Sequence, residues 1–360
     1  MPANRREFLK RAAAAAVAGA APTTAGSQSA AMPTPRAAAL MTAFNLKFPI
    51  FNAGMGAFAG PELAIAVSNA GGFGAIGTGP AMAADVLRER VRLVKAGTNR
   101  LFAINYLLAF EPVTLSIALE AGVPAVQFAW GFPRANAVAA VRKANAKMGI
   151  QISNVDGARL ALDLGVDYLI CQGIEAGGHV QALSALYDML PAVVEEAKSV
   201  PVLAAGGIAN GAHIRQALLA GASGVLVGTR FIATREAQAH DEYKAALSRA
   251  KASDTVLSIC FQDGWPNAAG RTLRNRTVDM WEAAGCPAPG KRPGEGEVLT
   301  TNAVTGLSKR RYSIGAPGPN DRGTIAELPL WAGRGVDAIR DIPSAADLVP
   351  RLWRECLDAT

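Results

Sequence analysis

A short run of chemically versatile side chains lies near the middle of the chain, at residues 171–179. It reads Cys-Gln-Gly-Ile-Glu-Ala-Gly-Gly-His and combines the amide of Gln172, the carboxylate of Glu175 and the imidazole of His179. An imidazole titrates near neutral pH and can accept a proton from a substrate. We therefore predict that His179 is the main catalytic side chain, although a single histidine is often only structural. Glu175 has two possible roles: it orients neighbouring groups, or it bonds to the backbone of its own turn.

Two glycine-bearing turns further along the chain predict a site for a phosphate group. Residues 204–208 read Ala-Ala-Gly-Gly-Ile, and residues 227–231 read Val-Gly-Thr-Arg-Phe. Glycine lets the backbone approach a bound anion, and N–H groups at the start of a helix favour phosphate. The alternative is that these glycines only permit tight turns.

The elements that must position these motifs alternate regularly along the chain. Short apolar runs predict eight strands, at Pro49–Asn52, Phe73–Gly77, Leu101–Tyr106, Ala125–Ala129, Ile150–Val155, Tyr168–Gln172, Val202–Ala205 and Gly224–Val227. Amphipathic stretches between them predict helices, among them Ala84–Lys95, Asn136–Lys147, Tyr187–Lys198 and Ala212–Ala220. These helices are expected to end at glycines, as helix caps often do: Gly97, Gly122, Gly149, Gly165 and Gly221.

Apolar strands that are each followed by a helix are typical of a parallel sheet. Eight such units within about 200 residues predict an α/β fold, a (β/α)₈ TIM barrel over residues 45–259, with an open doubly wound sheet as the alternative. The active site of such a barrel lies where the strands end and the βα loops begin. All three motifs fall at such positions.

Residues 260–330 break this rhythm. Gly-Pro clusters at 287–290 and 315–319 surround few periodic runs, which predicts an irregular lid or appendage. The tail at Ile342–Leu357 again has a helical pattern. We therefore expect residues 260–360 to form an irregular C-terminal appendage whose last helix packs back on the barrel.

The first thirty-one residues have the features of an export signal. Arg5 and Arg6 precede Phe-Leu-Lys, an alanine-rich run follows at 12–21, and small residues continue to Ala31. This order resembles a twin-arginine signal peptide, although Asn4 replaces the usual Ser or Thr. We expect a periplasmic or otherwise exported protein that uses the twin-arginine machinery, which carries folded proteins with their cofactors. A disordered basic tail is the alternative.

Composition excludes some classes of partner. The formal charge is +7, of which residues 1–31 contribute four basic side chains and one acidic side chain. No basic stripe interleaved with aromatic residues follows, so we expect no nucleic-acid partner. No later segment has about twenty uninterrupted apolar residues, so no stable membrane insertion is expected. The four cysteines and three histidines are scattered without ligand spacing, so no metal site is expected.

Several of these segments together resemble the nitronate monooxygenase family, once called 2-nitropropane dioxygenases. The resemblance rests on Pro49–Gly79, Gln172–His179, Pro201–Gly211, Gly221–Phe231, Leu273–Asn275 and Leu330–Val336. It covers nearly everything after residue 45. The Glu-Ala-Gly-Gly-His and Ala-Ala-Gly-Gly-Ile motifs are specific to the superfamily but not to one reaction within it.

The resemblance implies an FMN cofactor lying across the strand ends. The FMN phosphate would meet backbone N–H groups of Gly207, Gly228 and Thr229. The isoalloxazine would lie near Ala53, Gly54 and Met55, with Asn105, Gln172 and Gly177 alongside. Two departures from the family pattern matter. Gly54 stands where the family usually has proline, which predicts a looser loop beside the flavin, and residues 180–183 lack the glycine expected soon after the histidine.

By the same resemblance, the substrate is a small molecule, an alkyl nitronate, that O₂ oxidises to a carbonyl compound and nitrite. His179 would accept the α-proton of a neutral nitroalkane, or would hold or neutralise a nitronate anion. An FMN-dependent NAD(P)H:quinone or enoyl reductase is the second interpretation, since those enzymes share the Glu-Ala-Gly-Gly-His pattern. The absence of a Gly-x-Gly-x-x-Gly stretch after a strand weighs mildly against it. A flavin carrier without turnover is a third interpretation, and His179 argues against it.

Overall fold

Eight parallel strands form a closed barrel in the computed structural model, which describes residues 32–79 and 82–359. The predicted signal peptide at residues 1–31 lies outside the described residues. The N–H of Phe73 donates to the carbonyl of Ile50 (2.9 Å), and the N–H of Asn52 donates to that of Phe73 (3.2 Å). These bonds join the first strand to the second, so the TIM barrel is confirmed over an open sheet. The strands are β1 (Ile50–Asn52), β2 (Gly74–Gly77), β3 (Phe102–Leu107), β4 (Ala125–Ala129), β5 (Lys147–Ile152), β6 (Tyr168–Gln172), β8 (Val202–Ala205) and β9 (Gly224–Val227).

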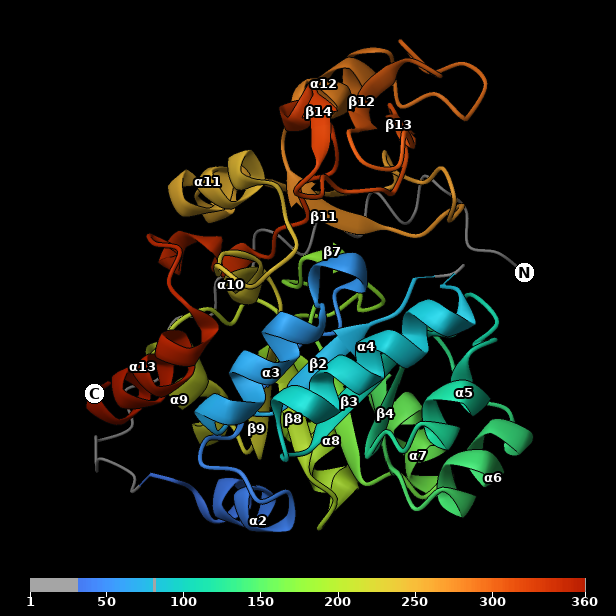
Figure 1. Ribbon diagram of the computed structural model, residues 1–360. Helices are drawn as coiled ribbons and strands as arrows, with labels where there is room; N and C mark the ends of the chain where they lie inside the picture. The colour runs from blue at the N-terminus through green and yellow to red at the C-terminus, as the bar shows by residue number, and fades with distance from the viewer. Residues whose placement is uncertain (1–31, 80–81, 360) are drawn as a thin grey trace.

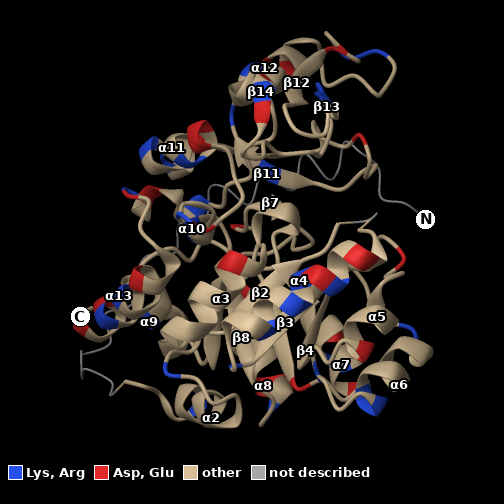
Figure 2. Ribbon diagram, viewed as in Figure 1, with Lys and Arg blue, Asp and Glu red and all other residues tan. Residues whose placement is uncertain are grey.

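Helices surround the barrel because each buries one apolar face against the strands (Figure 1). In α4, for example, Leu87, Val91 and Val94 are buried, while charged residues of both signs cover the outer face (Figure 2). Among residues 32–79 and 82–359, every helix is too short or too polar to cross a membrane. The outer helices are α3 (Pro61–Ala70), α4 (Ala84–Gly97), α5 (Leu115–Glu120), α6 (Ala135–Lys143), α7 (Val155–Asp163), α8 (Leu186–Ala197), α9 (Gly211–Leu219) and α13 (Ala345–Asp358).

The eighth helix of the ring comes from the end of the chain. Strand β9 is followed only by the short α10 (Thr229–Ile232), and α13 instead packs against α9 and α3 (Figure 1). Gly211 allows this close approach, because a Cβ there would lie 2.3 Å from the backbone nitrogen of Cys356. The tail of the chain therefore packs on the barrel. Residues 233–344 form an insertion between the last strand and its helix, and we call them the appendage.

The end of the barrel opposite the appendage is closed by helix α2 (Pro35–Ala43) and aromatic packing (Figure 1). The ring of Phe44 lies 5.5 to 6.2 Å from those of Phe51, Phe73 and Tyr168, edge-on to each. All four side chains are buried. Because this end is sealed, a ligand can enter only at the carboxyl ends of the strands.

Two predicted boundaries are wrong around the fifth strand. The helix predicted to run to Lys147 ends at Lys143, because Asn145 adopts a left-handed φ of 52° that stops it. The strand then runs from Lys147 to Ile152 rather than from 150 to 155, and Asn154 caps α7 by accepting a bond from the N–H of Gly157 at 2.7 Å. Gly149, predicted as a helix end, lies inside β5, where a Cβ would meet the Tyr168 ring at 2.3 Å.

The appendage contains more regular structure than its Gly-Pro content predicted. Strands β10 (Thr255–Ser258) and β11 (Gly270–Leu273) form a three-stranded sheet with β7 (Gly178–His179), and β12 (Val298–Asn302), β13 (Ser308–Arg310) and β14 (Asp321–Gly323) form a second. Its helices include α11 (Asp241–Arg249) and α12 (Arg276–Ala283). The elements of the appendage thus begin before residue 260. They also pair directly with the strand that carries the predicted catalytic histidine.

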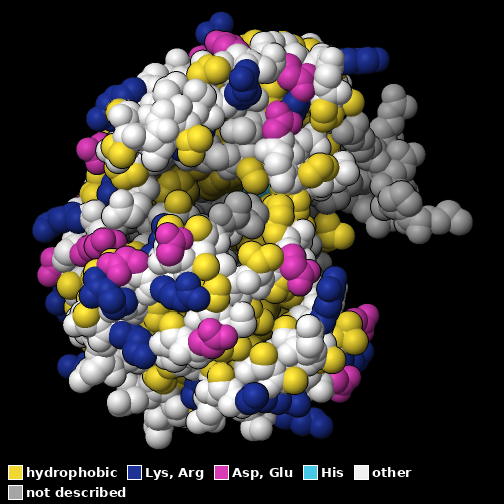
Figure 3. Space-filling model, turned by 45° about the vertical axis from the view of Figure 1, so that its right-hand side comes forward, with side chains coloured by type: hydrophobic (Ala, Val, Ile, Leu, Met, Phe, Trp, Pro, Cys, Tyr) yellow, Lys and Arg dark blue, Asp and Glu magenta, His cyan; other side chains and the backbone are white. Residues whose placement is uncertain are grey.

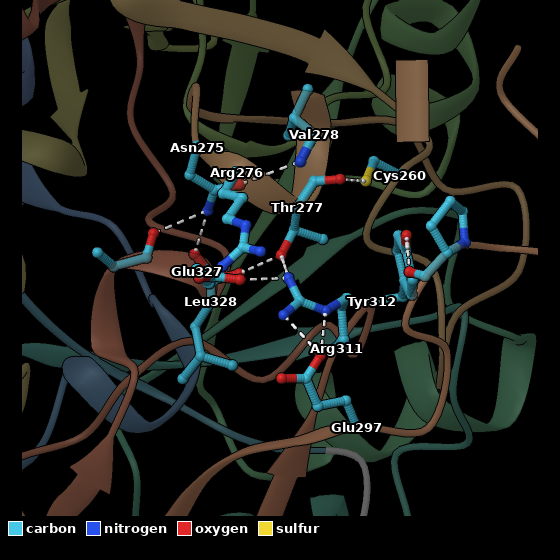
Figure 4. A network of polar contacts seen from close by, with 12 residues as sticks. Cys260, Asn275, Arg276, Thr277, Val278, Glu297, Arg311, Tyr312, Glu327 and Leu328 are labelled. Atoms are coloured by element: carbon cyan, nitrogen blue, oxygen red, sulfur yellow. Dashed lines mark hydrogen bonds and ion pairs between the residues drawn. The ribbon is translucent and has the colours of Figure 1, made fainter. Parts of the chain in front are cut away.

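A buried arginine joins three parts of the appendage (Figure 4). The guanidinium of Arg311, whose side chain is 2% exposed, donates to Glu297 at 2.8 and 3.0 Å, to the hydroxyl of Thr277 at 2.7 Å, and to Glu327. Asn275 adds bonds to the carbonyls of Ala326 (3.0 Å) and Leu328 (2.9 Å). A buried arginine is stable only when its donors are paired, so this network fixes how α12, β13 and the segment after β14 sit together.

Candidate active site

A cavity of about 1000 Å³ lies at the carboxyl ends of the barrel strands, beneath the appendage. Figure 3 shows a hollow between the two parts of the molecule, with hydrophobic side chains around it. Every residue predicted for the site lines this cavity: Ala53, Gly54, Met55, Asn105, Gln172, Gly177, His179, Gly207, Gly228 and Thr229. The predicted motifs therefore converge in space, although they span more than 170 residues of sequence.

His179 is held by the two-residue strand β7. Its backbone pairs with Gly270 of β11, so the histidine is shared between a barrel loop and the appendage. Its imidazole lies among three indole rings, with ring centroids 4.3 Å from Trp265, 4.8 Å from Trp331 and 6.2 Å from Trp130. This arrangement could not be predicted from the motifs, because Trp265 and Trp331 come from the appendage.

The environment of His179 favours the neutral imidazole. Burial lowers its pKa to about 4, since a charged ring would lose its hydration among the indoles. Its buried Nε2 has no hydrogen-bond partner in the described part of the chain. An uncharged ring with a free nitrogen, facing a cavity, can accept a proton or a hydrogen bond from a bound molecule.

The loop after His179 is fixed by glutamine side chains. Gln172 Oε1 accepts the N–H of Gln181 at 3.0 Å, and Gln181 Oε1 in turn accepts the N–H of Trp130 at 3.1 Å and Gln151 Nε2 at 2.9 Å. Trp130 has a left-handed φ of 62°, a strained conformation that this bond helps to hold. Gln181 thus fixes the segment where a glycine was expected.

The floor of the cavity carries a row of amide side chains on successive strands. Asn105, Gln127, Gln151 and Gln172 stand on β3, β4, β5 and β6, and all line the cavity. The amide of the fully buried Gln127 has the hydroxyl of Tyr168 beside it and no other hydrogen-bond partner in the described structure. A buried amide with unused hydrogen-bonding capacity is costly, so this floor is suited to a ligand that has both donors and acceptors along one edge. Gln127 and Gln151 were not predicted, although a polar residue within an apolar strand is a readable signal.

The two glycine turns are shaped to receive an anion. Gly206 and Gly207 have φ of 111° and 71°, which only glycine adopts readily. Among the described residues, the N–H groups of Gly207, Gly228 and Thr229 donate to no protein group. Backbone N–H groups of this kind form anion-binding concavities.

The segment Trp331–Gly335 fastens the appendage over these turns. The N–H of Gly333 donates to Thr229 Oγ1 at 3.0 Å, and that of Arg334 donates to the carbonyl of Glu175 at 2.9 Å. A Cβ on Gly177 would lie 2.3 Å from the nitrogen of Gly333. One segment of the appendage therefore touches the loops after β6 and β9 together.

The comparison with protein families decides what kind of site this is. The family model described as nitronate monooxygenase matches residues 38–115 and 110–355, which include the whole barrel and the appendage. This chain belongs to the nitronate monooxygenase family. It is therefore an oxidoreductase, and the resemblance drawn from the motifs is confirmed at the level of the family.

Individual relatives agree with this assignment. A nitronate monooxygenase from Pseudomonas aeruginosa is 31% identical over 85% of this chain and 95% of the relative. A nitroalkane oxidase structure from Streptomyces ansochromogenes is 27% identical, with a TM-score of 0.72 over 89% of this chain and 98% of that one. A variant of FabK from Thermotoga maritima is 25% identical, with a TM-score of 0.69 over 89% of this chain and 95% of that one.

The departure from the family pattern at Gly54 has a structural reason. A Cβ at this position would lie 2.3 Å from Cβ of Asn105, so glycine lets Asn105 pack directly on the loop. Asn105 Nδ2 also lies 3.5 Å from the carbonyl of Gly54. The close approach of the neighbouring strand therefore requires glycine at this position.

Glu175 bonds to the backbone of a segment eleven residues further along the chain, and not to that of its own turn. Its Oε2 accepts the N–H of Leu186 at the start of α8 at 3.1 Å, and its side chain does not line the cavity. In the described residues, no group of three or more His, Cys, Asp or Glu side chains is arranged to hold a metal.

Proposed function

We propose that this chain binds FMN across the open end of the barrel and oxidises alkyl nitronates with O₂ to a carbonyl compound and nitrite. The observation that carries the proposal is that His179, the amide floor and both glycine turns face one cavity in a member of this family. Two nitronate anions and one O₂ contain the atoms and charge of two carbonyl compounds and two nitrite ions. The reaction thus needs no outside reductant.

The residues present fit FMN. The free N–H groups of Gly207, Gly228 and Thr229 would hold the phosphate. The amide side chains of the cavity floor support a flavin edge that both donates and accepts hydrogen bonds. When bound, FMN supplies the electron exchange between substrate and O₂. The residues that would contact the isoalloxazine are Ala53, Gly54, Met55, Asn105, Gln172 and Gly177.

His179 would manage the charge of the substrate. An anion beside an imidazole raises its pKa, so a nitronate that enters would draw one proton from solvent onto His179. A neutral nitroalkane would instead give its α-proton to His179 Nε2. Both routes end in the same pair of imidazolium and nitronate. The second is slower, because a base of lowered pKa is a poor acceptor from a weak carbon acid.

The stoichiometry of turnover tests the proposal. Purified protein with bound FMN is mixed with alkyl and arylalkyl nitronates in air, and O₂ consumption and nitrite are measured together. We expect nitrite and the carbonyl compound in equal amounts and one O₂ for every two nitrites. If none of the nitronates released nitrite, the proposal would be contradicted.

An FMN-dependent NAD(P)H reductase is the second candidate. It is favoured by the similarity to FabK, whose barrel this chain shares over most of its length. Reduction of the bound flavin by NADH in the absence of O₂, followed by transfer to a quinone or an enoyl acceptor, would establish it.

We also propose that the chain is exported through the twin-arginine route. The support is the sequence of the first thirty-one residues, with Arg5 and Arg6 before an apolar run. Replacing both arginines with lysine should retain the protein in the cytoplasm with its flavin bound. Equal periplasmic amounts of the variant and the parent would exclude this route.

A further inference from the structure

Aromatic side chains form a continuous wall around His179. The indole of Trp265 lies 4.3 Å from the imidazole, 4.7 Å from the ring of Trp130 and 5.2 Å from that of Phe110, measured between ring centroids. Trp331 lies 4.8 Å from the imidazole on another side. These four aromatic rings line the cavity, together with Ile314. They converge from two parts of the molecule, since Phe110 and Trp130 follow β3 and β4 while the other two belong to the appendage.

The cationic side chains that line the cavity interact with other groups of the protein. Among the described lining residues, the charged ones are Glu62, Arg90 and Lys309. Arg90 donates to the carbonyl of Gly77 at 3.3 Å, and nearby Glu62 offsets its charge. Arg90 therefore already interacts with a carbonyl and a carboxylate of the protein.

Lys309 is neutralised by a buried carboxylate. It forms an ion pair with Asp321, which is 1% exposed and also accepts Asn302 Nδ2 at 3.1 Å and the N–H of Gly318 at 2.8 Å. Taking Lys309 away from Asp321 would leave a buried carboxylate without its cation, which is costly. The pair therefore shapes the loop before β14, and Lys309 is not available to a ligand.

We infer that the preferred substrates carry an aromatic ring next to the nitro-bearing carbon, and that short or carboxylated nitronates are poor substrates. The inference deepens the proposed function and rests on it for the reaction. Trp265, Trp130 and Phe110 pack against one another, so a flat substituent can lie against the wall that they form. Each well-placed aromatic pair adds affinity beyond the apolar area it buries. A carboxylate among these rings would lose its hydration without finding a cation.

The first test compares three nitronates with the wild-type enzyme: phenylnitromethane nitronate, ethyl nitronate and propionate 3-nitronate. We expect kcat/KM for the aryl compound to exceed the other two at least tenfold, in line with what apolar pocket contacts contribute to discrimination. Equal or higher kcat/KM for propionate 3-nitronate would overturn the inference.

The second test replaces one aromatic ring of the wall around His179. Trp265→Leu should lower kcat/KM for the aryl nitronate about tenfold and change that for ethyl nitronate by less than about twofold. Trp353→Leu is the matched control, because Trp353 packs against Phe48 on the outside of the barrel and does not line the cavity. If Trp265→Leu does not fold, Phe110→Leu tests the same wall. An equal loss on both substrates would show that the residue supports the fold and does not select the ring.

A binding measurement separates this inference from the proposed reaction. Nitrobenzene has no α-proton and cannot form a nitronate, so its affinity for the flavin-loaded enzyme by calorimetry reports the pocket alone. Binding that Trp265→Leu weakens about tenfold would support the aromatic pocket even if no nitronate were turned over. Absence of binding, or binding at least as tight by nitroethane, would overturn the inference whatever the enzyme oxidises.

Discussion

The two walls of the cavity are built on different physical principles. The barrel wall is set by backbone pairing between parallel strands and by buried apolar side chains, and its polar groups are amides and glycine N–H groups. The appendage wall contributes Trp265 and Trp331, and buried ion pairs such as those of Arg311 and Lys309 hold it together. If the proposed function holds, the barrel wall would bind the cofactor and the appendage wall would select the substrate. His179 stands where the two walls meet.

The largest effect should come from His179→Asn, which removes the residue common to both walls. Turnover of neutral nitroalkanes should fall about 10²- to 10⁴-fold, the range that general-base catalysis contributes, while nitronates lose less because they arrive deprotonated. FMN content should stay unchanged, since the barrel wall is intact. Steady-state kinetics on paired nitroalkane and nitronate substrates checks this, and an equal loss on both would exclude the role in proton abstraction.

Arg311→Met should weaken only the appendage wall. Removing Arg311 from the buried ionic network leaves Glu327, which is 12% exposed, with only the exposed Arg276 at 3.4 Å as a cation. We expect a loss of about 3 kcal/mol in the unfolding free energy of that region. Limited proteolysis and hydrogen exchange should show opening between residues 275 and 328, with the barrel still protected. Arg322→Met is the matched control, because Arg322 is exposed. Uniform loss of protection across barrel and appendage would mean that the two walls are one cooperative unit.

Gly177→Ala should disturb the joint between the walls. The added Cβ would lie 2.3 Å from the nitrogen of Gly333, and overpacking of this kind costs about 1 to 3 kcal/mol. We expect a lower melting temperature and weaker FMN retention. Gly79→Ala is the control, since its Cβ would have no atom of the described residues within 4 Å. Identical behaviour of the two variants would show that the joint tolerates a shift.

The smallest effect concerns pH. Burial lowers the pKa of His179 to about 4, below its value of 6.5 in the unfolded chain, so the unfolded state binds more protons between these values. The contribution of His179 to stability is thus complete above pH 6.5 and is lost as the pH falls towards 4. We compare the unfolding free energy of flavin-free wild type with that of His179→Asn at pH 7 and at pH 4.5. Between these pH values we expect wild type to lose on the order of 1 to 2 kcal/mol more than the variant. Urea unfolding at the two pH values measures this, and parallel losses would indicate that His179 is not desolvated.

These walls also differ in how far the sequence predicts them. Barrel strands such as Tyr168–Gln172 were predicted to the residue, because an apolar run between turn signals permits few other structures. The fifth strand was misplaced by three residues, since Asn145 ends the helix through a left-handed turn that periodicity does not reveal. The site residues at strand ends converge as predicted, because a barrel brings all strand ends to one rim.

The aromatic wall around His179 could not be predicted in the same way. Trp265 and Trp331 are 66 residues apart and lie in a segment without a repeating pattern, so only the folded appendage places them beside His179. Trp130 did carry a signal, because it directly follows a predicted strand and therefore had to lie at the rim. Gln127 and Gln151 carried another, as polar side chains in strands whose neighbours are apolar.

The central claim, that the barrel-bound flavin takes electrons from nitronates, is tested most directly by anaerobic mixing. The purified flavoprotein is followed by absorbance while it is mixed, in parallel, with an arylalkyl nitronate, with propionate 3-nitronate and with NADH. The account predicts rapid loss of oxidised-flavin absorbance with the arylalkyl nitronate, a slower loss with propionate 3-nitronate and none with NADH. Rapid reduction by NADH alone would contradict it and would place the chain among the flavin reductases.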